Sequence, residues 1–123
     1  MWWFGKARPV DIWDEKVETP LGDIEAANRV RNICRTASDS AERAGRIAAD
    51  PGKRVRKSER ARNEQARVRY ERAARAAMEI AIKMSDDLMR DAAVRDIVDL
   101  CMKAANIKTA RTLLRAIQAT SIR

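Results

Sequence analysis

The position of the helix-breaking residues is the feature of this sequence that most restricts its fold. All four glycines and all three prolines lie at or before residue 52. From Lys53 to Arg123, no residue therefore forces a helix to end. The clusters of β-branched and aromatic residues that mark strands are absent. The sequence predicts an all-α protein.

The length and the alanine content indicate the size and kind of core. A chain of 123 residues fits one domain. Hydrophobic residues make up 46% of the chain, but 22 of them are alanines, which bury little area. We therefore expect stability to come from close helix–helix contacts and from high helix propensity. We expect a single helical domain over residues 19–123, preceded by an N-terminal aromatic arm over residues 1–18.

The first long helix is expected from about Pro20 to Ala49. Thr19 is a suitable N-cap before Pro20, and Asp50-Pro51-Gly52 is a typical turn after Ala49. Small residues spaced three and four apart form a seam that we expect to pack on a partner helix. The seam consists of Ala27, Val30, Cys34, Ala37, Ala41, Ala44 and Ala48, with Ile24, Ile33 and Ile47 beside it.

The second long helix is expected from about Lys53 to Ser85 or beyond, and two shorter helices follow. Ser85-Asp86-Asp87 either caps a new helix or lies on the exposed face of the same one, and Ala105-Asn106 is the expected break before the last helix. The predicted architecture is a long antiparallel helical hairpin with one or two shorter C-terminal helices. The apolar stripe of the second helix comprises Val55, Ala66, Tyr70, Ala73, Ala77, Ile80, Ala81, Met84 and Leu88.

Positive charge is concentrated on the second helix. Ten of the 26 basic residues lie in residues 53–75, against three acids, which leaves +7 of the formal net charge of +8. We predict that this face binds nucleic-acid phosphates with little sequence selectivity. In two alternatives, the face is a solvated surface stabilised by Glu–Arg pairs, or it binds acidic protein, including another copy of the chain. The cations opposite the apolar stripe are Lys53, Arg54, Lys57, Arg60, Arg67, Arg72 and Arg75.

The last helix provides a second basic group, Lys108, Arg111 and Arg115. Residues 94–118 have the outline of a helix-turn-helix, in which the start of the second helix would contact the major groove. The alternative is a plain helical hairpin, which any two short consecutive helices resemble. We include these three cations among the candidate nucleic-acid contacts.

The N-terminal arm contains four of the five aromatic residues, Trp2, Trp3, Phe4 and Trp13. Exposed aromatics of this size are typical of surfaces that dock onto a protein partner, and we include these four as candidate partner contacts. The alternative that we favour is that the arm folds back and caps the helix bundle, with Trp13 filling the main contact. A membrane contact is the least favoured alternative, because so short an apolar segment would bind weakly.

Several kinds of chemistry lack the residues that they need. The chain has no histidine, and Cys34 and Cys101 are far apart in sequence, so we expect neither a metal site nor a cofactor. Neither a GxxxxGK[ST] nor a GxSxG motif occurs, so we do not expect an enzyme. The opening apolar run is shorter than a signal peptide needs, and no stretch approaches membrane-spanning length, so we expect neither. With two thiols that we expect to be buried, this favours a cytoplasmic location.

Together these patterns predict a small, non-enzymatic nucleic-acid-binding accessory or regulatory protein that associates with itself. The alternative is a helical adaptor, inhibitor or assembly subunit of a larger phage or bacterial complex. In that case, the N-terminal aromatics and the alanine seams would dock onto the partner.

Overall fold

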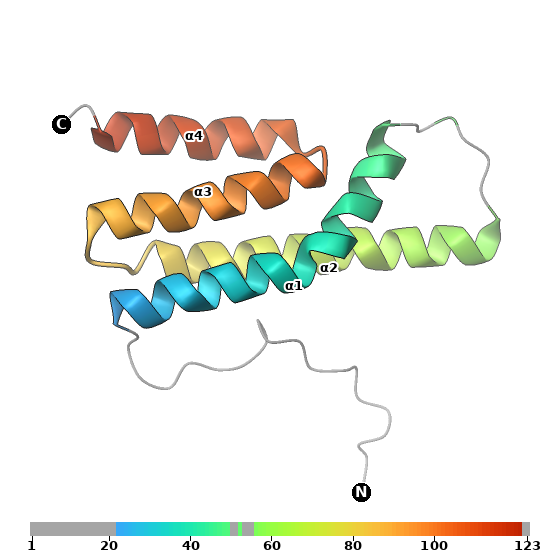
Figure 1. Ribbon diagram of the computed structural model, residues 1–123. Coiled ribbons are helices and arrows are strands. Elements are labelled where there is room, and N and C mark those ends of the chain that lie inside the picture. Colours follow the sequence, from blue (N-terminus) through green and yellow to red (C-terminus); the bar gives the residue numbers. More distant parts are fainter. Residues whose placement is uncertain (1–21, 50–51, 53–55, 122–123) are drawn as a thin grey trace, which may run out of the picture.

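A computed structural model describes residues 22–49, 52 and 56–121 of the chain (Figure 1). Within these ranges it contains four helices and no strand: α1 (Asp23–Ala49), α2 (Lys57–Ala81), α3 (Asp87–Lys103) and α4 (Ile107–Ser121). The prediction of an all-α fold is confirmed. The candidate residues Trp2, Trp3, Phe4, Trp13, Lys53 and Arg54 lie outside the described residues.

Small side chains form the contact between α1 and α2. On α2, the predicted stripe is confirmed for Ala66, Tyr70, Ala73, Ala77 and Ala81, all of which are buried. The alanines in this row let the two backbones approach closely. Each alanine buries little apolar area, and its high helix propensity compensates for this.

The buried stripe of α1 differs in part from the predicted seam. Val30, Ala37, Ala41 and Ala44 are buried as expected, but Ala48 is exposed. Beside the seam, Ile33 is buried and Ile24 is exposed. The buried set also includes Ala26, because α1 packs against both α2 and α3 and so buries a wider face than a single partner helix would require. The buried members of the seam thus lie inside the bundle.

The second helix ends at Ala81, earlier than predicted, and α3 begins with its own cap. The Asp86 carboxylate accepts a hydrogen bond from the Met89 backbone N–H at 2.8 Å, as an N-cap residue does. Because the new helix has a new phase, Leu88 does not continue the apolar stripe of α2 and is 80% exposed.

The turn before α3 is tied to the start of α1. The two carboxylate oxygens of Asp23 accept hydrogen bonds from the backbone N–H groups of Ser85 at 2.9 Å and Asp86 at 2.8 Å. These contacts satisfy backbone donors near the beginning of α3 that have no partner within that helix. They also fix the first turn of α1 beside the first turn of α3.

The turn between α3 and α4 closes at the predicted break. Ala105 has a left-handed φ of 57°, the Asn106 N–H donates to the Cys101 carbonyl at 2.8 Å, and the Ala105 N–H donates to the Met102 carbonyl at 3.0 Å. This is the Schellman pattern that ends many helices, with alanine in place of the usual glycine. Figure 1 shows α4 then running back alongside α3, against which it packs.

The last part of α1 crosses over this turn. Figure 1 shows α1 bending away from the line of its first half and rising toward the start of α4. Gly45 makes this approach possible, because a Cβ atom built at this position would lie 2.0 Å from the Lys103 carbonyl oxygen. The contact holds the C-terminal end of α1 beside the first half of α2 and the α3–α4 turn.

None of the described helices combines the length and the apolarity that a membrane crossing requires.

Candidate functional site

Three of the predicted phosphate-binding residues are exposed cations on α2. Lys57, Arg60 and Arg75 are solvent-exposed, and within the described part of the chain none of them forms an ion pair. Their charges are therefore available to an external anion. Lys57 and Arg60 lie near the start of the helix, whereas Arg75 lies four turns further along.

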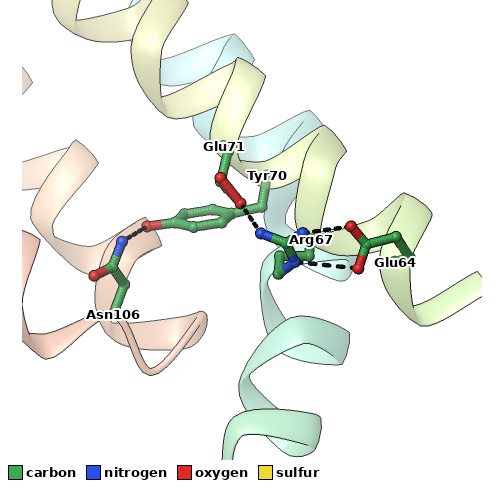
Figure 2. A network of polar contacts seen from close by, with 5 residues as sticks. All are labelled: Glu64, Arg67, Tyr70, Glu71 and Asn106. Carbon is green, nitrogen blue, oxygen red and sulfur yellow. Dashed lines mark hydrogen bonds and ion pairs between the residues drawn. The ribbon is translucent and has the colours of Figure 1, made fainter. Parts of the chain in front are cut away.

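Arg67, between these groups, is compensated by two glutamates (Figure 2). Its guanidinium donates to both carboxylate oxygens of Glu64, from Nε at 3.3 Å and from Nη2, and its Nη1 donates to Glu71 at 2.6 Å. The hydrogen bond to Glu64, with the charges of both glutamates, raises the pKa of Arg67 above its ordinary value. One cation between two carboxylates carries a net charge of −1, so the cationic face of α2 is interrupted at its centre.

The arginines beside the α1 contact make internal interactions. Arg69 donates from Nη1 to the Ser40 hydroxyl oxygen at 3.4 Å, and Arg43 donates from Nε to the Asn63 side-chain oxygen at 3.0 Å. Arg72 is half-buried and also has an interaction partner. The hydrogen bonds of Arg69 and Arg43 link α2 to α1. Fewer α2 cations therefore face solvent freely.

The second predicted basic group lies apart from α2. Lys108, Arg111 and Arg115 are exposed on α4, and no acidic residue interrupts the α4 sequence. Figure 1 shows α4 on the side of α3 that faces away from α2. The structure therefore presents two separate basic surfaces. The α4 helix packs against α3.

A groove of about 780 Å³ lies where the end of α1, the first half of α2 and the α3–α4 turn meet. Its apolar wall is formed by Ala44, Ile47 and Ala48 of α1, and Tyr70 and Asn106 lie at the end toward α4. The charged residues that line it are the arginines Arg43, Arg46, Arg60 and Arg67 and the glutamates Glu59, Glu64 and Glu71.

Tyr70 and Asn106 link the groove to the core. Asn106 donates from Nδ2 to the Tyr70 hydroxyl oxygen at 2.9 Å (Figure 2). The Asn106 Oδ1 accepts from the Thr109 N–H at 3.4 Å in the first turn of α4. The Tyr70 side chain is only 3% exposed, and this burial raises the pKa of its hydroxyl. Tyr70 is therefore neutral and structural at physiological pH, and one asparagine connects α2 to the start of α4.

Arg43 and Arg46 are groove residues that the sequence reasoning did not select. They belong to α1 and lie outside the basic segment, so neither charge density nor helical periodicity marked them. The one local signal was Gly45 between them, because a glycine within a helical stretch can mark a close backbone approach.

Neither cysteine is an activated thiol. Both are free; Cys101 is buried and Cys34 half-buried. Burial, followed by the negative charge of Asp96, raises the pKa of the Cys34 thiol to about 12, and burial also raises the pKa of Cys101. Across the described ranges, no three cysteine or acidic side chains are grouped so as to hold a metal ion.

A scan against protein-family models finds no match to this chain, and neither a search of curated proteins nor a search of solved structures finds a similar one.

Proposed function

We propose that this protein is a non-enzymatic nucleic-acid-binding accessory or regulatory protein that contacts phosphates through α2. The observation that supports this most directly is the set of exposed cations without an internal acid partner, Lys57, Arg60 and Arg75. They are distributed along a helix of 25 residues, about 37 Å long, so one helix can reach several phosphates. In the sequence, Lys53 and Arg54 come just before α2 and add two more positive charges to this basic segment.

The compensated Arg67 limits the kind of recognition that we propose. With the central cation held by Glu64 and Glu71, contacts are made by cations at the two ends of α2 rather than by an unbroken row. Such contacts release counterions and carry little sequence information. We therefore expect affinity that depends steeply on salt and weakly on sequence. The cations of α4 form a second contact surface in this proposal.

The test is a salt-titrated binding assay with unrelated nucleic-acid sequences. Reversing Arg60 and Arg75 together to glutamate should abolish binding, because it replaces two attractive contacts by two repulsive ones. Reversing two exposed arginines elsewhere, Arg31 on α1 and Arg95 on α3, changes the net charge equally and serves as the matched control. If both double variants weaken binding equally, only the overall charge matters and the α2 surface is not the site.

A second candidate function is a protein–protein adaptor or assembly subunit. The observation that favours it is the exposure of two large apolar side chains, Ile24 at 70% and Leu88 at 80%, at the starts of α1 and α3. The aromatic arm, residues 1–18, precedes α1 by only a few residues in the sequence. In this alternative, the arm and the exposed Ile24 and Leu88 side chains all contact the partner. Substituting Trp2 and Trp3 by alanine should then abolish partner binding and leave the thermal stability unchanged.

We also propose a cytoplasmic location and self-association. The two free cysteines fit a reducing compartment. The basic α2 and the acidic residues of α3 provide opposite charges through which two copies could attract each other.

A further inference from the structure

The groove between α1 and α2 has the size of a ligand site and a fixed shape. Its volume of about 780 Å³ lies within the range of small-molecule pockets. Its α1 wall is held in place by the close contact of Gly45 with the Lys103 carbonyl and by the hydrogen bond from Arg43 to Asn63. The wall opposite is the continuous helix α2. The groove is therefore largely formed before any ligand binds.

The charges in the groove are arranged unequally along its length. Arg46 of α1 and Arg60 of α2 both line it, and neither is paired with an acid in the part of the chain that the structure describes. Arg43 and Glu59 line the same end, so its three arginines and one glutamate leave a net charge of +2. Eleven residues further along α2, about 16 Å away, Glu71 lines the same groove beside Tyr70. Arg67 is bound between Glu64 and Glu71, so that end carries a net negative charge. One end thus suits an anion and the other suits N–H donors.

A nucleotide unit has this combination of groups. Its phosphate is an anion that arginine binds well. The edges of its bases carry amino groups, which can donate hydrogen bonds to carboxylate oxygens. The apolar wall of Ala44, Ile47 and Ala48 offers a surface for the face of a base or a sugar. The two arginines come from different helices and line the same groove.

The shape of the groove favours a single strand over a duplex. A duplex carries its phosphates on a stiff outer surface, which can contact the exposed face of α2 but is too wide to enter a groove of about 780 Å³. An unpaired strand can turn an individual base and phosphate into such a site.

We propose that this groove binds a nucleotide unit of single-stranded nucleic acid, with the phosphate on Arg46 and Arg60 and the base toward Glu71. The inference depends on the proposed nucleic-acid function and specifies its ligand class. It also assigns a binding role to Arg46, which lies outside the basic segment of residues 53–75.

The experiment measures the fluorescence anisotropy of labelled single-stranded DNA, single-stranded RNA and duplex DNA of the same sequence and length. The proteins are the full-length chain, Arg46→Gln in the groove, and Arg75→Gln on α2 outside the groove. We expect either single strand to bind more tightly than the duplex. We expect Arg46→Gln to weaken single-strand binding by about tenfold, since it removes a charged hydrogen bond to phosphate. Arg75→Gln should weaken single-strand and duplex binding by similar, smaller factors.

The outcomes separate this inference from the function on which it depends. If Arg75→Gln weakens binding and Arg46→Gln does not, or if the duplex binds as tightly as the single strands, the groove proposal is wrong and the α2 surface remains the site. If none of the three nucleic acids binds, both proposals are wrong. Arg46 is exposed, and an unchanged circular-dichroism melting curve verifies that Arg46→Gln is folded.

Discussion

Replacing Gly45 with alanine tests how closely α1 approaches the end of α3. Helix propensity alone predicts that alanine stabilises α1 by about 1 kcal/mol relative to glycine. The structure predicts the opposite sign, because the new Cβ would lie 2.0 Å from the Lys103 carbonyl oxygen, and 3.1 Å from its carbonyl carbon. A backbone carbonyl cannot rotate away as a side chain can, so the two helices must separate.

The expected cost follows from these two opposing effects. Overpacking a close contact costs about 1–3 kcal/mol, and the upper value applies here because the clash is with backbone on a rigid helix end. After the propensity gain is subtracted, we expect a net loss of about 2 kcal/mol. For a domain of this size, that corresponds to a fall in Tm of about 8 °C.

The measurement is thermal and urea unfolding followed by circular dichroism. Gly52→Ala is the matched control, because no atom lies within 4 Å of its built Cβ and its φ is not positive. The control should be neutral or stabilising by up to about 1 kcal/mol. A Gly45→Ala protein with an unchanged or higher Tm would refute the close approach of α1 to the α3–α4 turn, and with it the geometry of the groove.

Three further predictions concern the α3–α4 turn and the cysteines. Ala105→Gly should stabilise the protein by about 1 kcal/mol, because the left-handed φ of 57° costs alanine energy that glycine avoids; a loss of stability in urea unfolding would contradict this. Asn106→Ala should lower the free energy of unfolding by about 2 kcal/mol, since it removes both a helix cap and a hydrogen bond. Tyr70→Phe removes only the hydroxyl and should lower it by about 1 kcal/mol. Equal losses for the two variants would argue against the cap. Cys34, with its pKa raised from 9.0 to about 12, should react with iodoacetamide much more slowly in the folded than in the urea-unfolded protein. Because the unfolded chain ionises this thiol first, stability should fall as pH rises from about 9 toward 12; rapid alkylation of the folded protein would contradict both expectations.

The class of fold and most of the buried face of α2 were predictable from local pattern. Ala66, Tyr70, Ala73, Ala77 and Ala81 recur at helical spacing in a segment without breakers, and one-sided burial of such a helix follows directly. The end of α2 was less predictable. Ser85-Asp86-Asp87 fits both a cap and an exposed helical face, and the contacts that select the cap come from Asp23, more than 60 residues earlier.

The ion pairs on α2 could be anticipated as a class but not assigned. Glu64 is spaced to pair with Arg60 or Arg67, and Glu71 with Arg67 or Arg75. In the structure, both glutamates bind Arg67, which leaves Arg60 and Arg75 without an acid partner among the described residues. Spacing alone does not distinguish these pairings, because exposed pairs differ little in free energy.

The groove could not be predicted from sequence, because it depends on the direction of the end of α1. Arg43 and Arg46 lie in a stretch of mixed charge, and they meet α2 only because α1 crosses the α3–α4 turn at Gly45. The bend of a helix is set by its tertiary contacts rather than by its own periodicity.

The salt dependence of single-strand binding is the most direct test of the proposal that cations of α2 bind nucleic-acid phosphates. The logarithm of the affinity should fall linearly with the logarithm of the salt concentration. Substituting glutamine for Lys57, Arg60 and Arg75 together should reduce that slope by roughly 2, since each phosphate contact to a single strand contributes about 0.7. An unchanged slope in the triple variant, or binding that does not depend on salt, would contradict the proposed function.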